Sequence, residues 1–134
     1  MRKVLVFGVF DGLHEGHKQF LKQARAQGDY LVALVARDTV AEGLKGIYPR
    51  LPILVRMEHL KSSEYVDEVV MGDRLGENYV MFRKQRPAVV ALGYDQQPLK
   101  EDLEKRQQGK EFDWEFEIKV MEPHEPEKFH SSIL

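Results

Sequence analysis

The chain contains no cysteine, which excludes disulfide bonds, thiolate catalysis and cysteine-ligated metal sites. It also lacks a strong excess of either charge, since 20 Lys and Arg residues stand against 22 Asp and Glu residues and give a formal net charge of -2. Such a balance does not favour binding to nucleic acid or to another polyanion. These features are compatible with a reducing cytoplasm, and we expect a cytoplasmic protein with no nucleic-acid partner.

Long hydrophobic runs are lacking as well. No apolar stretch approaches the length needed to cross a membrane. The N-terminal apolar run is interrupted by Gly8, Asp11 and His14 before the core of a signal peptide could form. We therefore expect no membrane partner and an unprocessed chain. Its 134 residues are predicted to form a single domain over residues 1–134.

A glycine-rich segment with two histidines follows the first apolar run. Val4–Phe7 is apolar throughout, as in a strand that is buried on both faces, and His14 and His17 come shortly after it. The glycines allow the backbone to turn and to approach a ligand closely. A helix that begins at these histidines presents unpaired N–H groups and a partial positive charge, and the imidazoles add further donors. This pattern predicts a phosphate-binding turn between a strand and a helix.

Strand-like and helix-like patterns alternate along the rest of the chain. Apolar, partly β-branched runs predict strands around residues 4–7, 30–36, 65–71, 88–92 and 116–120. Apolar residues at helical spacing predict helices between them, marked by Phe20, Leu21 and Ala24, by Ile53, Met57 and Leu60, by Leu75, Tyr79 and Phe82, and by Leu99 and Leu103. This alternation predicts an α/β fold with a parallel sheet, whose strand order the periodicity leaves open.

Two other segments are expected near the strand ends. Residues 37–52 contain Gly43, Gly46, Pro49 and Pro52, and we expect a mobile loop there. The polar residues 93–96 follow the fourth strand, at the edge where open parallel sheets bind ligands. Both segments are therefore candidates for a binding site.

The histidine segment resembles the signature of the HxGH nucleotidyltransferases, G-[TV]-F-D-x-x-H-x-G-H. The sequence matches it at every specified position, with valine at the variable one: Gly8, Val9, Phe10, Asp11, His14, Gly16 and His17. Further landmarks, at residues 35–38, 44–46, 92–96 and 131–132, are similar to those of the small cytidylyltransferase-like branch. Within this branch the runs Val35–Asp38 and Leu92–Gln96 are more similar to the archaeal-type FAD synthetases than to the glycerol-3-phosphate cytidylyltransferases.

The resemblance implies a Rossmann-like open five-stranded parallel sheet with helices on both faces, and the nucleotide at the carboxyl edge of the first and fourth strands. It also implies catalytic roles for His14 and His17, on the α- and β-phosphates, and for Lys45 and Arg56. Arg56 lies off the apolar stripe of its helix, and we expect it to face a ligand, with a surface ion pair as the alternative.

Other residues are expected to contact the nucleotide. They are Gly8, Val9, Phe10, Asp11, Glu15, Gly16, Gly93, Asp95, His124, Ser131 and Ser132. Three of these roles have structural alternatives. Asp11 either orients its loop or helps to place a magnesium ion, Asp95 either binds ribose or base or is an ordinary turn aspartate, and the serines either bind phosphate or cap a helix.

The predicted function is nucleotidyl transfer from ATP or CTP to a small phosphorylated acceptor, with release of pyrophosphate and with Mg²⁺ as cofactor. FMN is the preferred acceptor, which would make FAD. Glycerol-3-phosphate cytidylyltransferase activity and a non-catalytic nucleotide-binding module are the alternatives. The resemblance further implies a homodimer. A class I aminoacyl-tRNA synthetase, which shares the histidine motif, needs a much longer chain.

Overall fold

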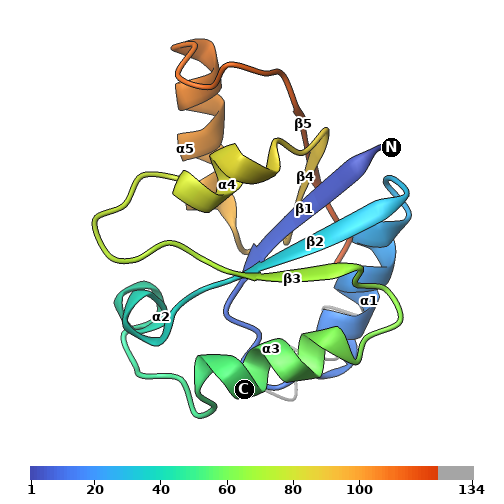
Figure 1. Cartoon of the computed structure of the whole chain (residues 1–134), viewed down its shortest axis with the longest axis vertical. Coiled ribbons are helices and arrows are strands. Elements are labelled where there is room, and N and C mark those ends of the chain that lie inside the picture. The colour runs from blue at the N-terminus through green and yellow to red at the C-terminus, as the bar shows by residue number, and fades with distance from the viewer. Residues whose placement is uncertain (124–134) are drawn as a thin grey trace.

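The computed structural model describes residues 1–123, and five parallel strands form one sheet within them. The strands are β1 (Lys3–Gly8), β2 (Tyr30–Val35), β3 (Glu68–Met71), β4 (Val89–Leu92) and β5 (Glu117–Val120), in the order β3-β2-β1-β4-β5 (Figure 1). The longest pairing joins β1 to β2, from Lys3 opposite Tyr30 to Gly8 opposite Val35. The expected five-stranded, Rossmann-like parallel sheet is confirmed.

Helices cover both faces of this sheet, because its central strands are apolar on both sides. Helices α1 (Glu15–Arg25) and α3 (Ile53–Lys61) pack on the face that carries Val4 and Val6 of β1. Helices α4 (Val80–Gln85) and α5 (Gln97–Gln108) lie on the other face, which carries Leu5. Figure 1 shows the two helix layers on opposite sides of the strands.

Aromatic side chains fill the layer beneath α4 and α5. Phe82 is fully buried, and its ring lies 5.1–5.2 Å, centroid to centroid, from those of Phe112, Trp114 and Phe116. Three of these residues come from the segment between α5 and β5. The aromatic contacts therefore hold an irregular segment against the edge of the sheet.

The structure corrects the prediction for residues 37–52, which were expected to form a loop throughout. Helix α2 (Asp38–Lys45) occupies the first half of this segment and ends at Gly46, whose φ is 79°. Gly46 therefore terminates a helix in the left-handed conformation rather than interrupting a loop, and Ala41 anchors that helix by burial.

Two smaller boundaries also differ from the prediction. Strand β3 begins at Glu68 rather than near residue 65. Helix α4 begins only at Val80, because the carboxylate of Asp73 accepts hydrogen bonds from the N–H groups of Val80 and Met81 and so caps the helix start at that point.

Strand order places two predicted loops side by side. Strands β1 and β4 are neighbours, with Val4 opposite Val89 and Leu5 opposite Val90. The chain leaves β1 toward α1 on one face and leaves β4 toward α5 on the other. This is the point where open α/β sheets form a ligand crevice, at the carboxyl ends of their strands.

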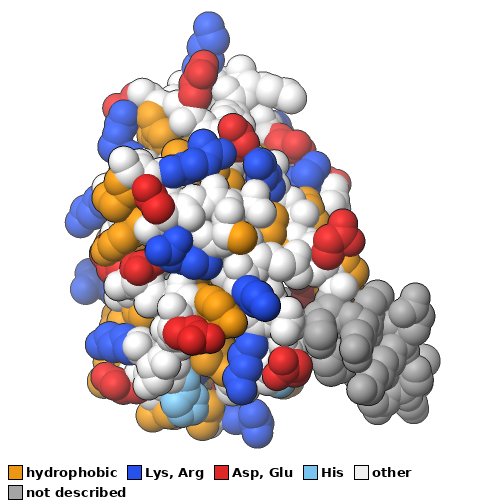
Figure 2. Space-filling model, turned by 90° about the vertical axis from the view of Figure 1, so that its right-hand side faces the viewer, with side chains coloured by type: hydrophobic (Ala, Val, Ile, Leu, Met, Phe, Trp, Pro, Cys, Tyr) orange, Lys and Arg blue, Asp and Glu red, His pale blue; other side chains and the backbone are white. Residues whose placement is uncertain are grey.

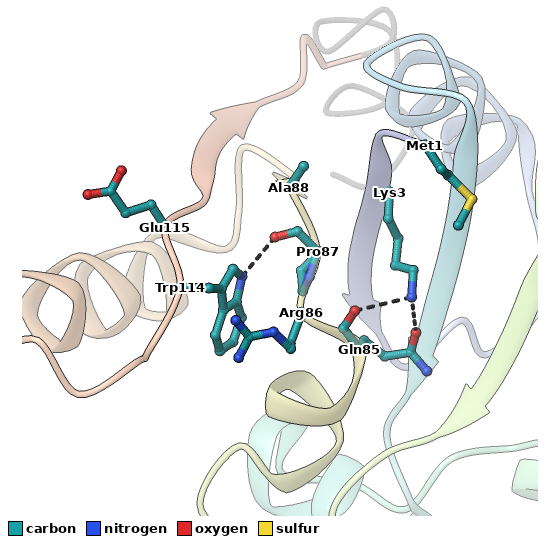
Figure 3. Close-up of a pocket in the computed structure, with 8 residues that line it drawn as sticks. All are labelled: Met1, Lys3, Gln85, Arg86, Pro87, Ala88, Trp114 and Glu115. Atoms are coloured by element: carbon teal, nitrogen blue, oxygen red, sulfur yellow. Dashed lines mark hydrogen bonds between the residues drawn. The ribbon is translucent and has the colours of Figure 1, made fainter.

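A cleft of about 330 Å³ lies at the opposite, amino edge of the sheet (Figure 3). Several of its polar groups bond to neighbouring residues. Lys3 Nζ donates to the carbonyl and side-chain oxygens of Gln85, and Trp114 Nε1 donates to the carbonyl of Pro87. Arg86 lies over the Trp114 ring and forms an ion pair with Asp113. These interactions join the start of β1 to the end of α4, and the segment before β5 to the segment before β4.

The charged surface agrees with the balanced composition. On the face drawn in Figure 2, Lys and Arg side chains are interspersed with Asp and Glu side chains. Among residues 1–123, no helix is both long and apolar enough to span a membrane.

The aromatic layer makes a prediction about stability. Replacing Phe82 with Ala removes the ring at its centre, and we expect the free energy of unfolding to fall by about 3–5 kcal/mol, measured by urea denaturation. Leu75→Ala is the control, because Leu75 is 67% exposed. A loss at Phe82 no larger than that at Leu75 would contradict this account of the core.

Candidate active site

The turn after β1 has a backbone that requires its glycines. Phe10 has a φ of 53° and Gly12 a φ of 93°, both in the left-handed region. A Cβ atom at Gly8 would lie 2.6 Å from the Phe10 ring, so only glycine fits there. Phe10 is buried, and its ring meets that of His17 nearly edge-on at 5.7 Å. The Phe10 ring of this turn therefore packs directly against the His17 ring.

The two predicted histidines stack against each other at the start of α1. Their ring centroids are 3.9 Å apart and the rings are inclined by 24°. His14 is the N-cap residue, and its Nδ1 accepts a hydrogen bond from the N–H of Gly16 at 3.1 Å. A Cβ at Gly16 would lie 2.9 Å from the His14 ring, so this glycine makes room for the cap. Both rings thus lie over the positive end of the helix.

The hydrogen bonds determine which ring nitrogen carries the proton. Because His14 Nδ1 accepts, the neutral His14 ring carries its proton on Nε2. His17 Nδ1 lies 3.0 Å from the Gly12 carbonyl, to which it must donate, and the His14 N–H at 3.5 Å is too distant to compete. Neutral His17 therefore has a lone pair on Nε2, and that atom becomes a donor only when the ring is protonated.

The surroundings of His17 oppose that protonation. The pKa of His17 is lowered from 6.5 to about 4, chiefly by burial and also by the nearby His14 and Lys45 charges, although the Gly12 hydrogen bond and the Asp95 charge act in the opposite direction. Lys45 ends α2 and Asp95 follows β4, so two separate crossovers bring a cation and a carboxylate to within electrostatic range of His17. The structure thus brings together four of the predicted residues.

Asp11 ties the histidine turn to the segment between α2 and α3. Its carboxylate accepts hydrogen bonds from the N–H groups of Arg50 and Leu51, at 2.8 and 2.9 Å. Burial raises the Asp11 pKa, but these backbone bonds and the charges of Arg50 and Arg56 outweigh it and keep the pKa below its ordinary value. The geometry supports the loop-orienting alternative for Asp11.

The same contact brings in a cation that the sequence prediction did not include. Arg50 Nη2 donates to the Asp11 carbonyl at 3.3 Å, and it lies 3.1 Å from the point where a Cβ on Gly12 would be. Arg50 is exposed beside the histidine turn. Its presence in the loop was visible in the sequence, but its partner 39 residues away was not.

Arg56 does not face a ligand as predicted, and this expectation is corrected. Its side chain is fully buried in α3. Nη1 donates to the Val9 carbonyl at 2.7 Å, Nε to the Leu51 carbonyl at 2.9 Å, and Nη2 to Asp38 Oδ1 at 2.5 Å. The expectation that Arg56 lies off the apolar stripe is also wrong, because residues 53, 56 and 60 share one face of a helix, and the histidine turn and α2 cover that face of α3. Arg56 is a structural link between these elements.

Gln96 makes a second link, which the prediction of individual site residues missed. Its amide nitrogen donates to the Phe7 carbonyl at 2.9 Å, and its side-chain oxygen accepts from the Gly93 N–H at 2.9 Å. This side chain therefore joins the end of β1 to the loop after β4. Gly93 also approaches Asp95 closely, since a Cβ on Gly93 would lie 2.9 Å from Asp95 Oδ1.

Of the other predicted contact residues, the structure describes Val9 and Glu15 but not the three near the C-terminus. Val9 is buried and offers its carbonyl to Arg56, whereas Glu15 is exposed in the first turn of α1. His124, Ser131 and Ser132 lie outside residues 1–123, which are the residues that the structure describes.

A family model described as cytidylyltransferase-like matches residues 5–134, which is nearly the whole chain. The chain belongs to the cytidylyltransferase-like family. The match confirms the predicted nucleotidyltransferase fold and enzyme class.

Named relatives of this cytidylyltransferase-like chain are archaeal. It is 43% identical over 108 residues to an FAD synthase of Thermococcus sibiricus, covering 78% of this chain and 73% of that enzyme. It is 41% identical over 104 residues to an FAD synthase of Pyrococcus horikoshii, covering 78% of this chain and 70% of that enzyme. Among solved structures, a lipopolysaccharide core biosynthesis protein from Thermoplasma volcanium superposes with a TM-score of 0.82 at 28% identity, over 92% of this chain and 98% of that one.

The described side chains near the candidate site offer few oxygen ligands for a metal ion. Within residues 1–123, no group of three or more His, Asp or Glu side chains is arranged to hold a metal ion. Both carboxylate oxygens of Asp11 already accept backbone hydrogen bonds. The described side chains therefore do not form a fitting magnesium site of their own.

The pKa of His17 predicts a pH-dependent contribution to stability. The folded protein takes up this proton only near pH 4, whereas the ordinary pKa is 6.5. Stability from His17 is thus fully present above about pH 6.5 and is lost as the pH falls toward 4. We expect His17→Asn to lose less unfolding free energy than the wild type between pH 6.5 and 4, measured by urea titrations. His59→Asn, at an exposed position of α3, is the control. Parallel pH curves for His17→Asn and the wild type would refute this assignment.

The buried Arg56–Asp38 pair makes a second prediction. Arg56→Met leaves the Asp38 carboxylate and two carbonyl oxygens without their donor, and we expect it to lower the free energy of unfolding by about 3–5 kcal/mol. With Asp38→Asn and the double variant, urea denaturation completes a double-mutant cycle. The double variant should lose less than the sum of the two single losses, and strictly additive losses would show that the pair is not coupled.

Proposed function

We propose that this protein is an FMN adenylyltransferase, which transfers AMP from ATP to FMN and so makes FAD and pyrophosphate. The stacked histidine pair at the start of α1 carries the proposal of nucleotidyl transfer. The choice of FMN and ATP is supported by the relatives named FAD synthase, which are 41–43% identical over more than two thirds of their length.

The proposed reaction needs little covalent chemistry from the protein. An oxygen of the FMN phosphate attacks the α-phosphorus of ATP, a new P–O bond forms, and the bond to the β-phosphate breaks to release pyrophosphate. The attacking phosphate is already an anion at neutral pH, so no general base is required. Catalysis then consists of positioning the two phosphates in line and stabilising the charge that develops on the leaving group.

The groups around the start of α1 are suited to that stabilisation. His14 Nε2–H and the first N–H groups of α1 are donors for phosphate oxygens, and Lys45 supplies a full positive charge within electrostatic range of His17. His17 is neutral near pH 7 in the free protein, since its pKa is about 4. A bound triphosphate would raise that pKa, and the protonated ring would then donate from Nε2.

Recognition of the nucleoside is assigned to the loop after β4. The exposed carboxylate of Asp95 is proposed to accept hydrogen bonds from ribose hydroxyls or from the base, beside the backbone of Gly93. Gln96 keeps this loop against the end of β1, at a constant distance from the histidine turn. The turns that would hold the phosphates and the nucleoside are therefore joined by hydrogen bonds.

Mg²⁺ is proposed to enter bound to the triphosphate, whose oxygens are ligands that this ion prefers. No step is assigned to it through side chains of the described part. The roles of His124, Ser131 and Ser132, the homodimer, the single domain and the cytoplasmic location stay predictions from the sequence.

An assay with the purified protein tests the proposal. We expect FAD and pyrophosphate to form from FMN and ATP, with CTP a poorer donor and glycerol 3-phosphate an inactive acceptor. We expect His14→Ala and His17→Ala each to lower kcat by about 100-fold or more, as for loss of an oxyanion donor. His59→Ala, outside the site, should keep the wild-type rate. Product is measured by chromatography and pyrophosphate release.

Two outcomes would contradict the proposal. If glycerol 3-phosphate and CTP were consumed while FMN and ATP were not, the acceptor assignment would be wrong and the protein would be a cytidylyltransferase. If pyrophosphate release survived both histidine substitutions, the proposed chemistry at the start of α1 would be wrong.

A further inference from the structure

Exposed apolar side chains gather in one short segment of the described chain, residues 44–55. Leu44 is 72% exposed, Ile47 71%, Tyr48 55%, Leu54 67% and Val55 38%. They occupy the end of α2, the following loop and the first turn of α3. We refer to these five side chains as the 44–55 apolar surface. A concentration of this kind on a protein surface is typical of a ligand or partner site.

The segment that carries this surface is hydrogen-bonded to the candidate active site. The N–H groups of Arg50 and Leu51, within the same segment, donate to the carboxylate of Asp11 in the histidine turn. Arg56, directly after the segment, donates to the carbonyl of Val9. The apolar side chains are thus carried by a segment that is bonded to the turn that holds the histidines both from within and from the residue that follows it.

Cations lie among the apolar residues of the segment. Lys45 stands between Leu44 and Ile47 in the sequence, and its charge acts on His17. Arg50 follows Tyr48 by two residues and reaches the backbone of Asp11. A ligand complementary to this arrangement carries an anionic phosphate and a large apolar group. FMN has this composition, since its ribityl chain joins a phosphate to a mostly apolar, planar ring system, whereas glycerol 3-phosphate has no apolar group.

We propose that the 44–55 apolar surface binds the isoalloxazine ring of FMN. The proposal rests on the function proposed above and assigns the acceptor's ring to a particular surface of the same site. Ile47 and Tyr48 are the residues assigned to the ring, because they lie between the two cations in the sequence, and an aromatic ring such as that of Tyr48 stacks well on a planar π system. The flavin phosphate then lies toward Lys45 and the histidine pair, where the reaction takes place.

Binding is tested first, without ATP. FMN is titrated with the wild-type protein and its fluorescence is recorded, because stacking on a tyrosine quenches flavin emission. We expect the wild type to quench FMN, and the double variant Ile47→Ser/Tyr48→Ser to bind FMN about tenfold more weakly or worse. Both side chains are more than half exposed, so their replacement should leave the fold intact, as circular dichroism checks.

Steady-state kinetics then show which substrate the surface serves. We expect the double variant to have a KM for FMN raised about tenfold or more, with the KM for ATP unchanged and kcat within about a factor of two. Leu75→Ser is the matched control, since Leu75 is 67% exposed but lies in the loop that leads from β3 to α4 on the other face of the sheet. This control should keep the wild-type KM values.

The possible outcomes separate this proposal from the proposed function. If the wild type makes FAD and the double variant keeps the wild-type KM and quenching, the flavin ring binds elsewhere and this inference is overturned while the function stands. If the wild type neither quenches FMN nor makes FAD, both proposals fail. If the double variant instead changes only the sedimentation of the protein, from dimer to monomer, a second copy of the chain covers the surface and the flavin assignment is wrong.

Discussion

The buried guanidinium of Arg56 is the contact on which the geometry of the candidate site depends. It bonds to the carbonyl of Val9 after β1, to the carbonyl of Leu51 before α3 and to Asp38 at the start of α2. A parallel sheet delivers these segments to one edge separately, through different crossovers. A single planar cation with several donors can join all three, and this explains why an arginine occupies a fully buried position here.

The contacts of the histidine pair determine the protonation state of His17. The Gly12 carbonyl orients His17, and the stacked His14 ring together with burial keeps His17 neutral in the free protein. An anion at the start of α1 reverses that balance, because it supplies the charge that the apolar surroundings lack. In the proposed reaction, the protonation of His17 would therefore depend on the bound triphosphate.

Asp11 connects the turn proposed to bind phosphate with the segment proposed to bind the acceptor. The proposals assign phosphate chemistry to residues close to the helix start and recognition of the acceptor to side chains of later segments. Asp11 connects the two by its hydrogen bonds to Arg50 and Leu51.

The sequence by itself determined the alternation of strands and helices and the glycine-rich turn that brings His14 and His17 to the start of α1, because both depend on residues that are close along the chain. Only the tertiary structure decided the strand order, the helix in the segment predicted as a loop, the burial of Arg56 and the position of Arg50. Arg50 and its partner Asp11 are 39 residues apart, and Arg56 and Val9 are 47 apart. No periodicity reports contacts at such distances, since they arise only when the sheet brings separate crossovers to one edge.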